Sequence, residues 1–362
     1  MFNYGVFSNV AKFLTVQELL TTYIVNNSLK EQTKDVQLIW RYHCEQLTVL
    51  LQVENIKRPI YQNYQTLIKL NNETLRKAIK IYLNNPKKIE SLLGKITFWD
   101  TSRVTNMSNL FKGAESFDEK LLWNTSQVTN MRSMFMGAEA FNQPLNFDTS
   151  QVTNMYGMFC NATSFNQPLN FNTSKVTNMS DMFYEAKAFN QPLNFDTSQT
   201  IDMSFMFWGA EIFNQPLNFD TSQVTNMSFM FWEAKSFNQP LNFDTSQVTN
   251  MSDMFAGAFS FNQPLNFDTS SVSDMSDMFY EAKAFNQPLN FDTSHVTNMS
   301  EMFAGAKAFN QPLNFDTSSV TNMSEMFFEA KAFNQEIDFD TSQVTNAENM
   351  FVGSKAYMKQ KS

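Results

Sequence analysis

The sequence predicts an α/β solenoid of about eleven stacked 24-residue strand–turn–helix repeats, preceded by a small all-α N-terminal module. A phenylalanine recurs every 24 residues, without insertion or deletion, from Phe111 to Phe351. A fixed period of this length is typical of repeat arrays, whose units stack because each is too small to bury its own apolar face. The 38 phenylalanines and 23 methionines of the 362-residue chain fall almost entirely at fixed repeat positions. Their excess therefore indicates that every repeat uses the same core residues.

Charge divides the chain into a basic first part and an acidic array. Residues 1–95 hold 13 Lys and Arg against 7 Asp and Glu, whereas residues 96–362 hold 13 against 28. This asymmetry indicates separate modules. The expected organisation is a helical module (1–52), a linker and helical N-terminal cap (53–95), the solenoid (96–357) and a tail (358–362). Nucleic acid is not an expected partner, because its binding begins from cationic surface.

Each repeat predicts a short strand followed by a short helix, as in residues 141–164. Leu145 and Phe147 alternate with polar residues, which is the period of a strand with one buried face. The apolar residues that follow have the spacing of an amphipathic helix; they are Val152, Met155, Phe159 and Ala162. We expect the strands to form one parallel sheet, with the helices covering its other side.

The boundaries of the expected helices carry capping signals. Asn154 is placed to cap the helix of its unit, and the sequence from Asn250 to Asp253 fits a capping box. The array also ends in atypical units: the first lacks Asn-Gln-Pro-Leu, and the last has Ala347 in place of a methionine. Atypical terminal units are expected where a solenoid must be capped.

The repeats resemble a known family over residues 73–357. The motif FDTSQVTNMSDMF at 243–255, with its variants in register, is similar to the BspA-type leucine-rich-like repeats of bacterial surface proteins, also catalogued as a mycoplasma family of unknown function. Residues 75–102 resemble the helical cap that often precedes such repeats. The resemblance implies a leucine-rich-repeat-like solenoid used for binding, without a shared enzymatic activity.

An acidic residue marks the same position in nine of the eleven units, and asparagine fills the other two. The nine are Asp100, Asp148, Asp196, Asp220, Asp244, Asp268, Asp292, Asp316 and Asp340. One interpretation is a row of carboxylates for calcium or a cationic partner. The favoured interpretation is an Asx-type turn, in which each side chain accepts from the N–H two residues on, a role that Asn124 and Asn172 can also serve. With no EF-hand loop or glycine-rich calcium repeat, no metal site is expected.

Two adjacent units depart from the others in a way that predicts a binding patch. The second residue between the paired methionines is polar or glycine in nine units but is Phe205 and Phe229 in the other two. Four further aromatic residues belong to the predicted patch: Tyr156, Tyr184, Trp208 and Trp232. A position that usually holds polar residues should be exposed, and exposed aromatic clusters are typical hot spots for partners. The tryptophan position also holds Met136 and Phe328, which favours a half-buried position as the alternative.

The N-terminal module resembles an F-box. Short amphipathic helices are followed by a polar stretch and then by Leu38-Ile-Trp40-Arg, although Val6-Phe7-Ser8 stands where that motif opens with Leu-Pro. The resemblance implies docking on a Skp-type adaptor through Val10, Phe13, Leu14, Leu19, Leu20 and Trp40. The alternative is a plain helical cap over the first repeat.

Nothing in the sequence points to catalysis or to a cofactor. His43 and His295 have no nucleophile or metal partner at a recognisable spacing. Cys44 and Cys160 lie in different modules, which favours a reducing compartment. No apolar run approaches the ~20 residues of a membrane span, and no signal peptide is recognised, so an intracellular location (cytoplasmic or nuclear) is expected.

The first functional hypothesis is therefore a non-enzymatic protein–protein interaction protein, the substrate-recognition adaptor of a Skp–cullin–F-box type ubiquitin ligase. The solenoid would hold the target, and the N-terminal module would hold the adaptor subunit. The alternatives are a BspA-like surface adhesion protein, as the repeat family implies, and a repeat scaffold without a ligase link.

Overall fold

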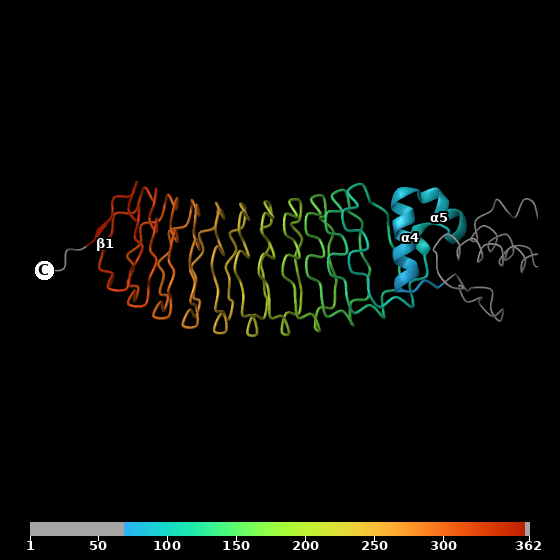
Figure 1. Cartoon of the computed structure of the whole chain (residues 1–362), viewed down its shortest axis with the longest axis horizontal. Helices are drawn as coiled ribbons and strands as arrows, with labels where there is room; N and C mark the ends of the chain where they lie inside the picture. Colours follow the sequence, from blue (N-terminus) through green and yellow to red (C-terminus); the bar gives the residue numbers. More distant parts are fainter. Residues whose placement is uncertain (1–68, 359–362) are drawn as a thin grey trace, which may run out of the picture.

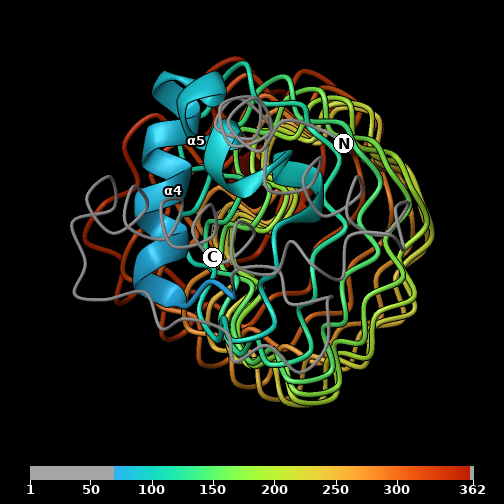
Figure 2. The same cartoon turned by 90° about the vertical axis from the view of Figure 1, so that its right-hand side faces the viewer.

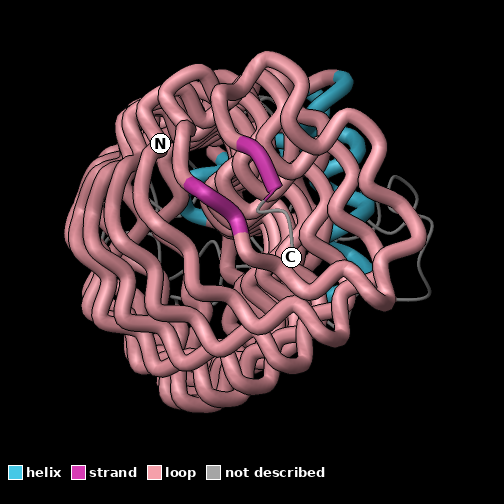
Figure 3. Tube along the Cα trace, turned by 90° about the vertical axis from the view of Figure 1, so that its left-hand side faces the viewer, coloured by secondary structure: helices cyan, strands magenta, loops and turns pink. Residues whose placement is uncertain are grey.

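In the computed structural model, which describes residues 69–358, the repeats form one stack of coils with helices at its N-terminal end (Figure 1). The helices are α4 (Asn72–Asn84), α5 (Pro86–Leu93) and the 3-10 turn η2 (Ile96–Phe98). Viewed along the stack, successive coils lie over one another (Figure 2). At the other end, β1 (Glu336–Ile337) pairs in parallel with β2 (Tyr357–Met358) (Figure 3). The solenoid that the sequence predicts is confirmed.

Helix α4 forms because its ends and its apolar face are both specified locally. Asn71 caps it: its side chain accepts from the N–H of Thr74, whose hydroxyl in turn accepts from the N–H of Asn71. The residues it buries are three or four apart, which places them on one helix face; they are Leu75, Ala78, Ile79 and Tyr82. Helix α5 then starts at Pro86, where a missing N–H costs nothing.

Polar side chains of α4 supply the hydrogen bonds that a preceding coil would make to the first coil. Asn72 Oδ1 accepts from the N–H groups of Thr105 (2.9 Å) and Asn106 (3.1 Å). The guanidinium of Arg76 donates to Asn106 Oδ1 at 3.0 Å and to the carbonyl of Ser108. The exposed edge of the stack is thereby covered, as a solenoid terminus requires.

The helices expected in the repeats are not formed; within residues 69–358, helix occurs only in α4, α5 and η2. The segment of Val152, Met155, Phe159 and Ala162 is instead a run of turns, in which alternate N–H groups bond within the coil and to the next coil. Met158 N–H donates to Met155 O at 3.1 Å, for example, whereas Phe159 N–H donates to Met182 O at 3.0 Å. The helical spacing is therefore real, but the backbone groups are satisfied between coils.

The expected sheet is also corrected. Leu145–Phe147 is not a strand; of the equivalent segments, Leu193 and Leu217 form a single bridge and only β1 is a named strand. Parallel pairing instead runs through one Asn or Asp of each unit, as in Asn154↔Asn178 and Asn178↔Asp202. Continuous pairing at one residue per coil joins all the coils without a conventional sheet, because turns interrupt the extended backbone on either side.

The predicted caps are in fact turns. Asn154 Oδ1 accepts from the N–H of Tyr156, two residues on, at 3.0 Å, and Asn250 Oδ1 accepts in the same way from Ser252 at 2.8 Å. Asp253 has φ 57, in the left-handed region, which ends any helix at that point. The Asn signal was therefore correct for a turn and wrong for a capping box.

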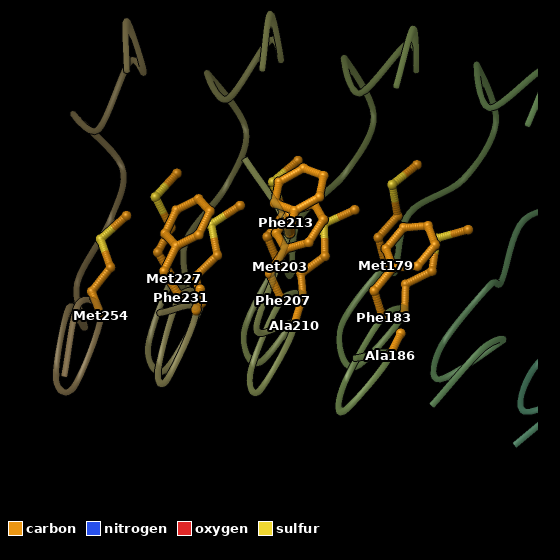
Figure 4. Close-up of a cluster of buried hydrophobic side chains, with 14 of the residues drawn as sticks. Met179, Phe183, Ala186, Met203, Phe207, Ala210, Phe213, Met227, Phe231 and Met254 are labelled. Carbon is orange, nitrogen blue, oxygen red and sulfur yellow. The ribbon is translucent and has the colours of Figure 1, made fainter. Parts of the chain in front are cut away.

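Columns of stacked phenylalanine rings fill the solenoid. Phe207 and Phe231 stack across coils at 5.7 Å between centroids, and Phe207 stacks on Phe213 within its coil at 4.2 Å. Methionines such as Met203 and the small Ala210 complete each layer (Figure 4). The phenylalanine and methionine excess is thus core packing, in which each layer contacts only its neighbours.

Two side-chain ladders run along the stack beside this core. The buried Thr149 hydroxyl donates to the carbonyl of Asn172 in the next coil at 2.9 Å, and the equivalent threonines repeat this bond. Asn238 Oδ1 accepts from the N–H of Asn262 (2.9 Å) and from Gln263 Nε2 (3.0 Å). Amide ladders of this kind fix the register of stacked chains.

A second alternation, with a period of two coils, is superimposed on the repeat. From the fourth coil onward one left-handed position holds Glu and Gly in turn: Glu185, Gly209, Glu233, Gly257, Glu281, Gly305, Glu329 and Gly353. Each glutamate side chain lies over the next glycine, so that a Cβ on Gly257 would lie 3.1 Å from Glu233 Cγ. Glycine leaves room for this side chain, and the backbone alone does not call for glycine, since glutamate adopts the same positive φ in alternate coils.

Candidate functional site

The row of aspartates forms Asx turns, as the favoured interpretation predicts. Asp148 Oδ1 accepts from the N–H of Ser150 at 3.0 Å, and every equivalent Asp or Asn makes the same bond. Hydrogen bonds from the Ser150 hydroxyl and N–H lower the pKa of Asp148. Residues 69–358 contain no group of three or more His, Cys, Asp or Glu side chains that could hold a metal ion. These carboxylates are accounted for by backbone geometry.

Five of the six aromatic residues of the predicted patch come together, and we call this group the aromatic platform. It consists of Tyr184, Phe205, Trp208, Phe229 and Trp232. The rings of Phe205 and Phe229 stack at 4.6 Å between centroids, and those of Trp208 and Trp232 at 4.0 Å. Tyr184 extends the tryptophan column, with its centroid 4.9 Å from that of Trp208.

Stacking leaves every ring of the platform half-buried. The exposure predicted at Phe205 and Phe229 is therefore only partial, since each ring covers part of the other and of the tryptophan beside it. The alternative of a half-buried tryptophan position is confirmed at Trp208 and Trp232. Half-buried rings held by their neighbours are rigid, and a rigid aromatic surface loses little entropy when a partner covers it.

Tyr156 lies outside the stack. Its ring lies under the guanidinium of Arg132, 4.3 Å from the ring centroid. A side-chain hydrogen bond with Asp181 is the main cause that raises the pKa of Tyr156 to about 12. The structure thus assigns Tyr156 to a polar cluster that spans the second to fourth coils, next to the platform.

The backbone at the two platform phenylalanines is unusual. Phe205 and Phe229 both have φ 59, in the left-handed region that a bulky side chain rarely adopts. The equivalent residues of other coils include Asn109, Gly157 and Asp253, which suit this conformation better. The fold therefore does not require phenylalanine here, because most coils place at this position a residue that adopts the left-handed conformation with less strain.

Carboxylates continue the phenylalanine column beyond the platform, a feature that sequence reasoning missed. Asp253, Asp277 and Glu301 occupy the equivalent position in the next three coils, and we call them the acidic strip. Burial, and then the neighbouring carboxylates, raise the pKa of Asp253 and of Asp277 to about 7. The sequence contained the necessary signal, because these acids stand at the same repeat position as Phe205 and Phe229. The acids were interpreted only as evidence that the position is exposed.

The other predicted site residues fall elsewhere. Val10, Phe13, Leu14, Leu19, Leu20 and Trp40 lie outside the described residues, as does the F-box-like module. Burial raises the pKa of the Cys160 thiol to about 11, so this cysteine is a core residue. None of the helices within 69–358 is long and apolar enough to cross a bilayer.

Comparison with known proteins places these repeats in a wider group. A family described as "Mycoplasma protein of unknown function, DUF285" matches residues 84–194, 145–218, 169–266, 218–290 and 289–362. A crystallised leucine-rich repeat protein from Eubacterium ventriosum ATCC 27560 is 12% identical over 82% of this chain and 88% of its own, with a TM-score of 0.41. A leucine-rich cell surface protein from Faecalibacterium prausnitzii A2-165 is 15% identical over 58% of this chain and 76% of its own, with a TM-score of 0.27. No curated protein matches the chain.

Proposed function

The chain belongs to the family of mycoplasma proteins of unknown function, DUF285, and on that basis we propose that it is a non-enzymatic protein-binding solenoid of the BspA type. A stack of near-identical coils provides extended surface, and such surfaces serve recognition in repeat proteins. A partner cannot distinguish one position from the next on a surface of identical coils, so we assign recognition to the coils that differ. The aromatic platform is the docking surface in this proposal.

The observation that carries this proposal is the stack of Phe205 and Phe229 at positive φ. All eleven coils have positive φ at this position, which costs a residue with a Cβ on the order of 1–2 kcal/mol, and asparagine, aspartate and glycine tolerate it better than the phenylalanine found in two adjacent coils. A poorly suited residue that the fold does not require points to a function. Stacked aromatic rings beside tryptophan match the composition of interface hot spots.

Selection of displayed random peptides on the full chain tests the proposal. The platform variant is Phe205→Asn with Phe229→Asn, because asparagine occupies the same position in the first and last coils and suits its φ. The control variant is Asn109→Asp with Asn349→Asp, at the same position but away from the platform. We expect enriched peptides to bind the platform variant about tenfold more weakly, a loss of about 1.4 kcal/mol, and to bind the control unchanged. Enriched peptides that bind both variants equally would contradict a docking role for the platform.

The ligase adaptor is the second candidate, and the observation that favours it is the F-box-like order of residues 1–52. In this candidate the target still binds the solenoid, while a Skp-type subunit binds the N-terminal module inside the cell. Co-purification of the full chain with a Skp-type adaptor tests it, with Leu14→Asp, Leu20→Asp and Trp40→Ala combined as the control. A complex that survives this triple variant, or no complex at all, leaves the solenoid without a ligase link.

A further inference from the structure

The aromatic platform and the acidic strip are parts of one continuous face. Phe229 N–H donates to Ser252 O (3.0 Å) and Asp253 N–H donates to Ser276 O (2.9 Å), so Phe229, Asp253 and Asp277 lie in consecutive coils at the same register. Aromatic rings therefore give way to carboxylates within a single step of the stack. A partner that covers the platform along the stack meets the acidic strip next.

Within residues 69–358, the carboxylates of the strip have no cationic partner. Asp253 and Asp277 form no ion pair with any residue between 69 and 358. The groups that act on Asp253 are Asp277, Asp274 and Glu301, and all of them are acidic. Two positions of each coil line this face: the position of Phe205 and Asp253, and the position of Trp208 and Trp232. From the fifth to the tenth coil, neither position holds a lysine or arginine. Partly buried charges that repel one another are expensive unless a partner neutralises them.

The rings of the platform are also suited to a cation. The quadrupole of an aromatic ring attracts a guanidinium or ammonium group that lies over its face. Stacking covers the inner faces of the two columns, but the coil after Phe229 and Trp232 holds Asp253 and Ala256 in place of rings, so the end face of each column is left for a cation. Such contacts occur twice elsewhere in this solenoid: Arg132 lies 4.3 Å from the centroid of Tyr156, and Lys283 Nζ lies 3.5 Å from that of Phe259. Both halves of the face therefore attract positive charge, although by different interactions.

The spacing of the coils fits an extended polypeptide. Within the platform, equivalent rings of adjacent coils lie 4.6 Å apart at Phe205 and Phe229 and 4.0 Å apart at Trp208 and Trp232. Neighbouring strands lie about 4.8 Å apart, so the five steps between six paired coils cover roughly 24 Å, the length of about seven extended residues. The face from Tyr184 to Glu301 spans six coils, which suits a segment of protein better than a small cation.

Building on the function proposed above, we propose that the partner presents an extended segment rich in arginine or lysine, which lies along the aromatic platform and continues over the acidic strip. Its cationic side chains stack on the end faces of Phe229 and Trp232 and pair with Asp253 and Asp277. The acidic array around the face attracts such a segment from a distance and repels an acidic one.

The composition of the selected peptides separates this inference from the function on which it rests. The strip variant is Asp253→Asn, Asp277→Asn and Glu301→Gln. We expect the enriched peptides to be rich in Arg and Lys and to bind both the strip variant and the platform variant about tenfold more weakly. Peptides that need the platform but carry no excess of cations and ignore the strip variant would overturn this inference alone. The absence of any platform-dependent peptide would overturn the proposed function.

A titration with one probe provides a second test. A fluorescent nonapeptide with arginine at alternate positions binds the full chain more tightly at pH 8 than at pH 5.5, because protonation of Asp253 and Asp277 removes their charge, and binding weakens as salt is added. In the variant Asp253→Asn with Asp277→Asn this pH dependence is largely lost. An equal pH dependence in the wild-type protein and the variant, or tighter binding at pH 5.5, would refute the role of the strip.

Discussion

Backbone conformation governs which residue stands between the paired methionines. All eleven residues at this position, from Asn109 to Asn349, have positive φ, and asparagine, aspartate and glycine tolerate that region best. The sequence showed this preference, but polar identity was read as exposure because a helix was expected there. Phe205 and Phe229 could be recognised as exceptions from sequence; that they are strained and half-buried follows only from the fold.

The acidic strip makes the stability of the fold depend on pH. The pKa of Asp253 and Asp277 rises to about 7 in the folded chain, against about 3.9 when unfolded. The folded state therefore holds more protons than the unfolded state, and the stability from these groups is lost as pH rises from about 4 through 7. We expect Asp253→Asn with Asp277→Asn to raise the thermal midpoint at pH 8 relative to wild type and to leave it nearly unchanged at pH 4.

The aspartates of the Asx turns should behave in the opposite way, which provides a control. The Ser150 hydroxyl and N–H lower the pKa of Asp148, so its contribution is present above the unfolded pKa and is lost as pH falls. Asp148→Asn should therefore leave the midpoint at pH 8 without a gain. The thermal midpoint is measured against pH for the wild type, for Asp253→Asn with Asp277→Asn and for Asp148→Asn. Three curves of the same shape would show that the strip takes up no extra protons on folding.

The Glu–Gly alternation makes equivalent glycines unequal. Gly257 lies beneath Glu233, whereas a Cβ on Gly113 would have no atom within 4 Å. Both have positive φ, so Gly→Glu brings similar backbone strain at each site. We expect Gly257→Glu to cost about 1 kcal/mol more than Gly113→Glu, since it adds overpacking and like-charge contact, as measured by the shift in urea midpoint. Equal shifts would mean that the glutamate side chain moves aside freely.

At the scale of the element, apolar spacing was insufficient to identify the backbone. Val152, Met155 and Phe159 have helical spacing, yet their coil is built from turns. Period alone reports which side chains face inward and not where the N–H groups bond. The local signals of α4, a capped start and a buried face, act within one segment, which is why residues 73–93 could be recognised as helical.

The asparagine ladder is the element whose removal is easiest to measure. Asn238 Oδ1 accepts from Asn262 N–H and Gln263 Nε2 in the next coil. Asn238→Ala leaves a half-buried N–H without its acceptor, and we expect a loss of about 1–2 kcal/mol in chemical denaturation. Asn334→Ala is the matched control, because among the described residues Asn334 Oδ1 accepts only from its neighbour Gln335, at 3.5 Å. If both variants lose the same stability, the ladder adds nothing beyond local packing.

For the whole molecule, the period was the most reliable prediction. It specified the number of coils, their register and the inward-facing residues, because all three depend on the fixed 24-residue spacing from Phe111 to Phe351. The face that we assign to a partner was only half predicted. The phenylalanines Phe205 and Phe229 could be recognised because they differ from the residues at the same position in other repeats. Asp253 and Asp277 could not, because aspartate is the most frequent residue at that position.

Deleting coils tests whether the stack behaves as a sum of neighbour contacts. Removing residues 262–309 joins Phe261 to Asn310 and keeps the order of glutamate and glycine coils, so we expect a folded protein. Removing only 286–309 places the coil of Glu281 against that of Glu329. We expect this shorter deletion to lower the thermal midpoint at least as much as the longer one.

Glu281→Gly, added to the shorter deletion, should recover most of that loss, because it removes the crowding side chain. The same substitution in the full chain serves as the control and should bring no gain. A shorter deletion that is clearly more stable than the longer one, without this rescue, would show that the alternation is tolerant of mismatched neighbours.

The alternation of glutamate and glycine restricts which coils can follow one another. A coil with Glu281 packs well only against a following coil with glycine at that position, such as Gly305, whereas adjacent glycine coils such as those of Gly113 and Gly137 pack without a clash. Two coils advance the stack by roughly 10 Å, at the ~4.8 Å spacing of hydrogen-bonded strands. The array beyond the aromatic platform can therefore lengthen by one coil without a clash only if the duplicated coil is of the Gly305 type, because a second coil of the Glu281 type places glutamate against glutamate.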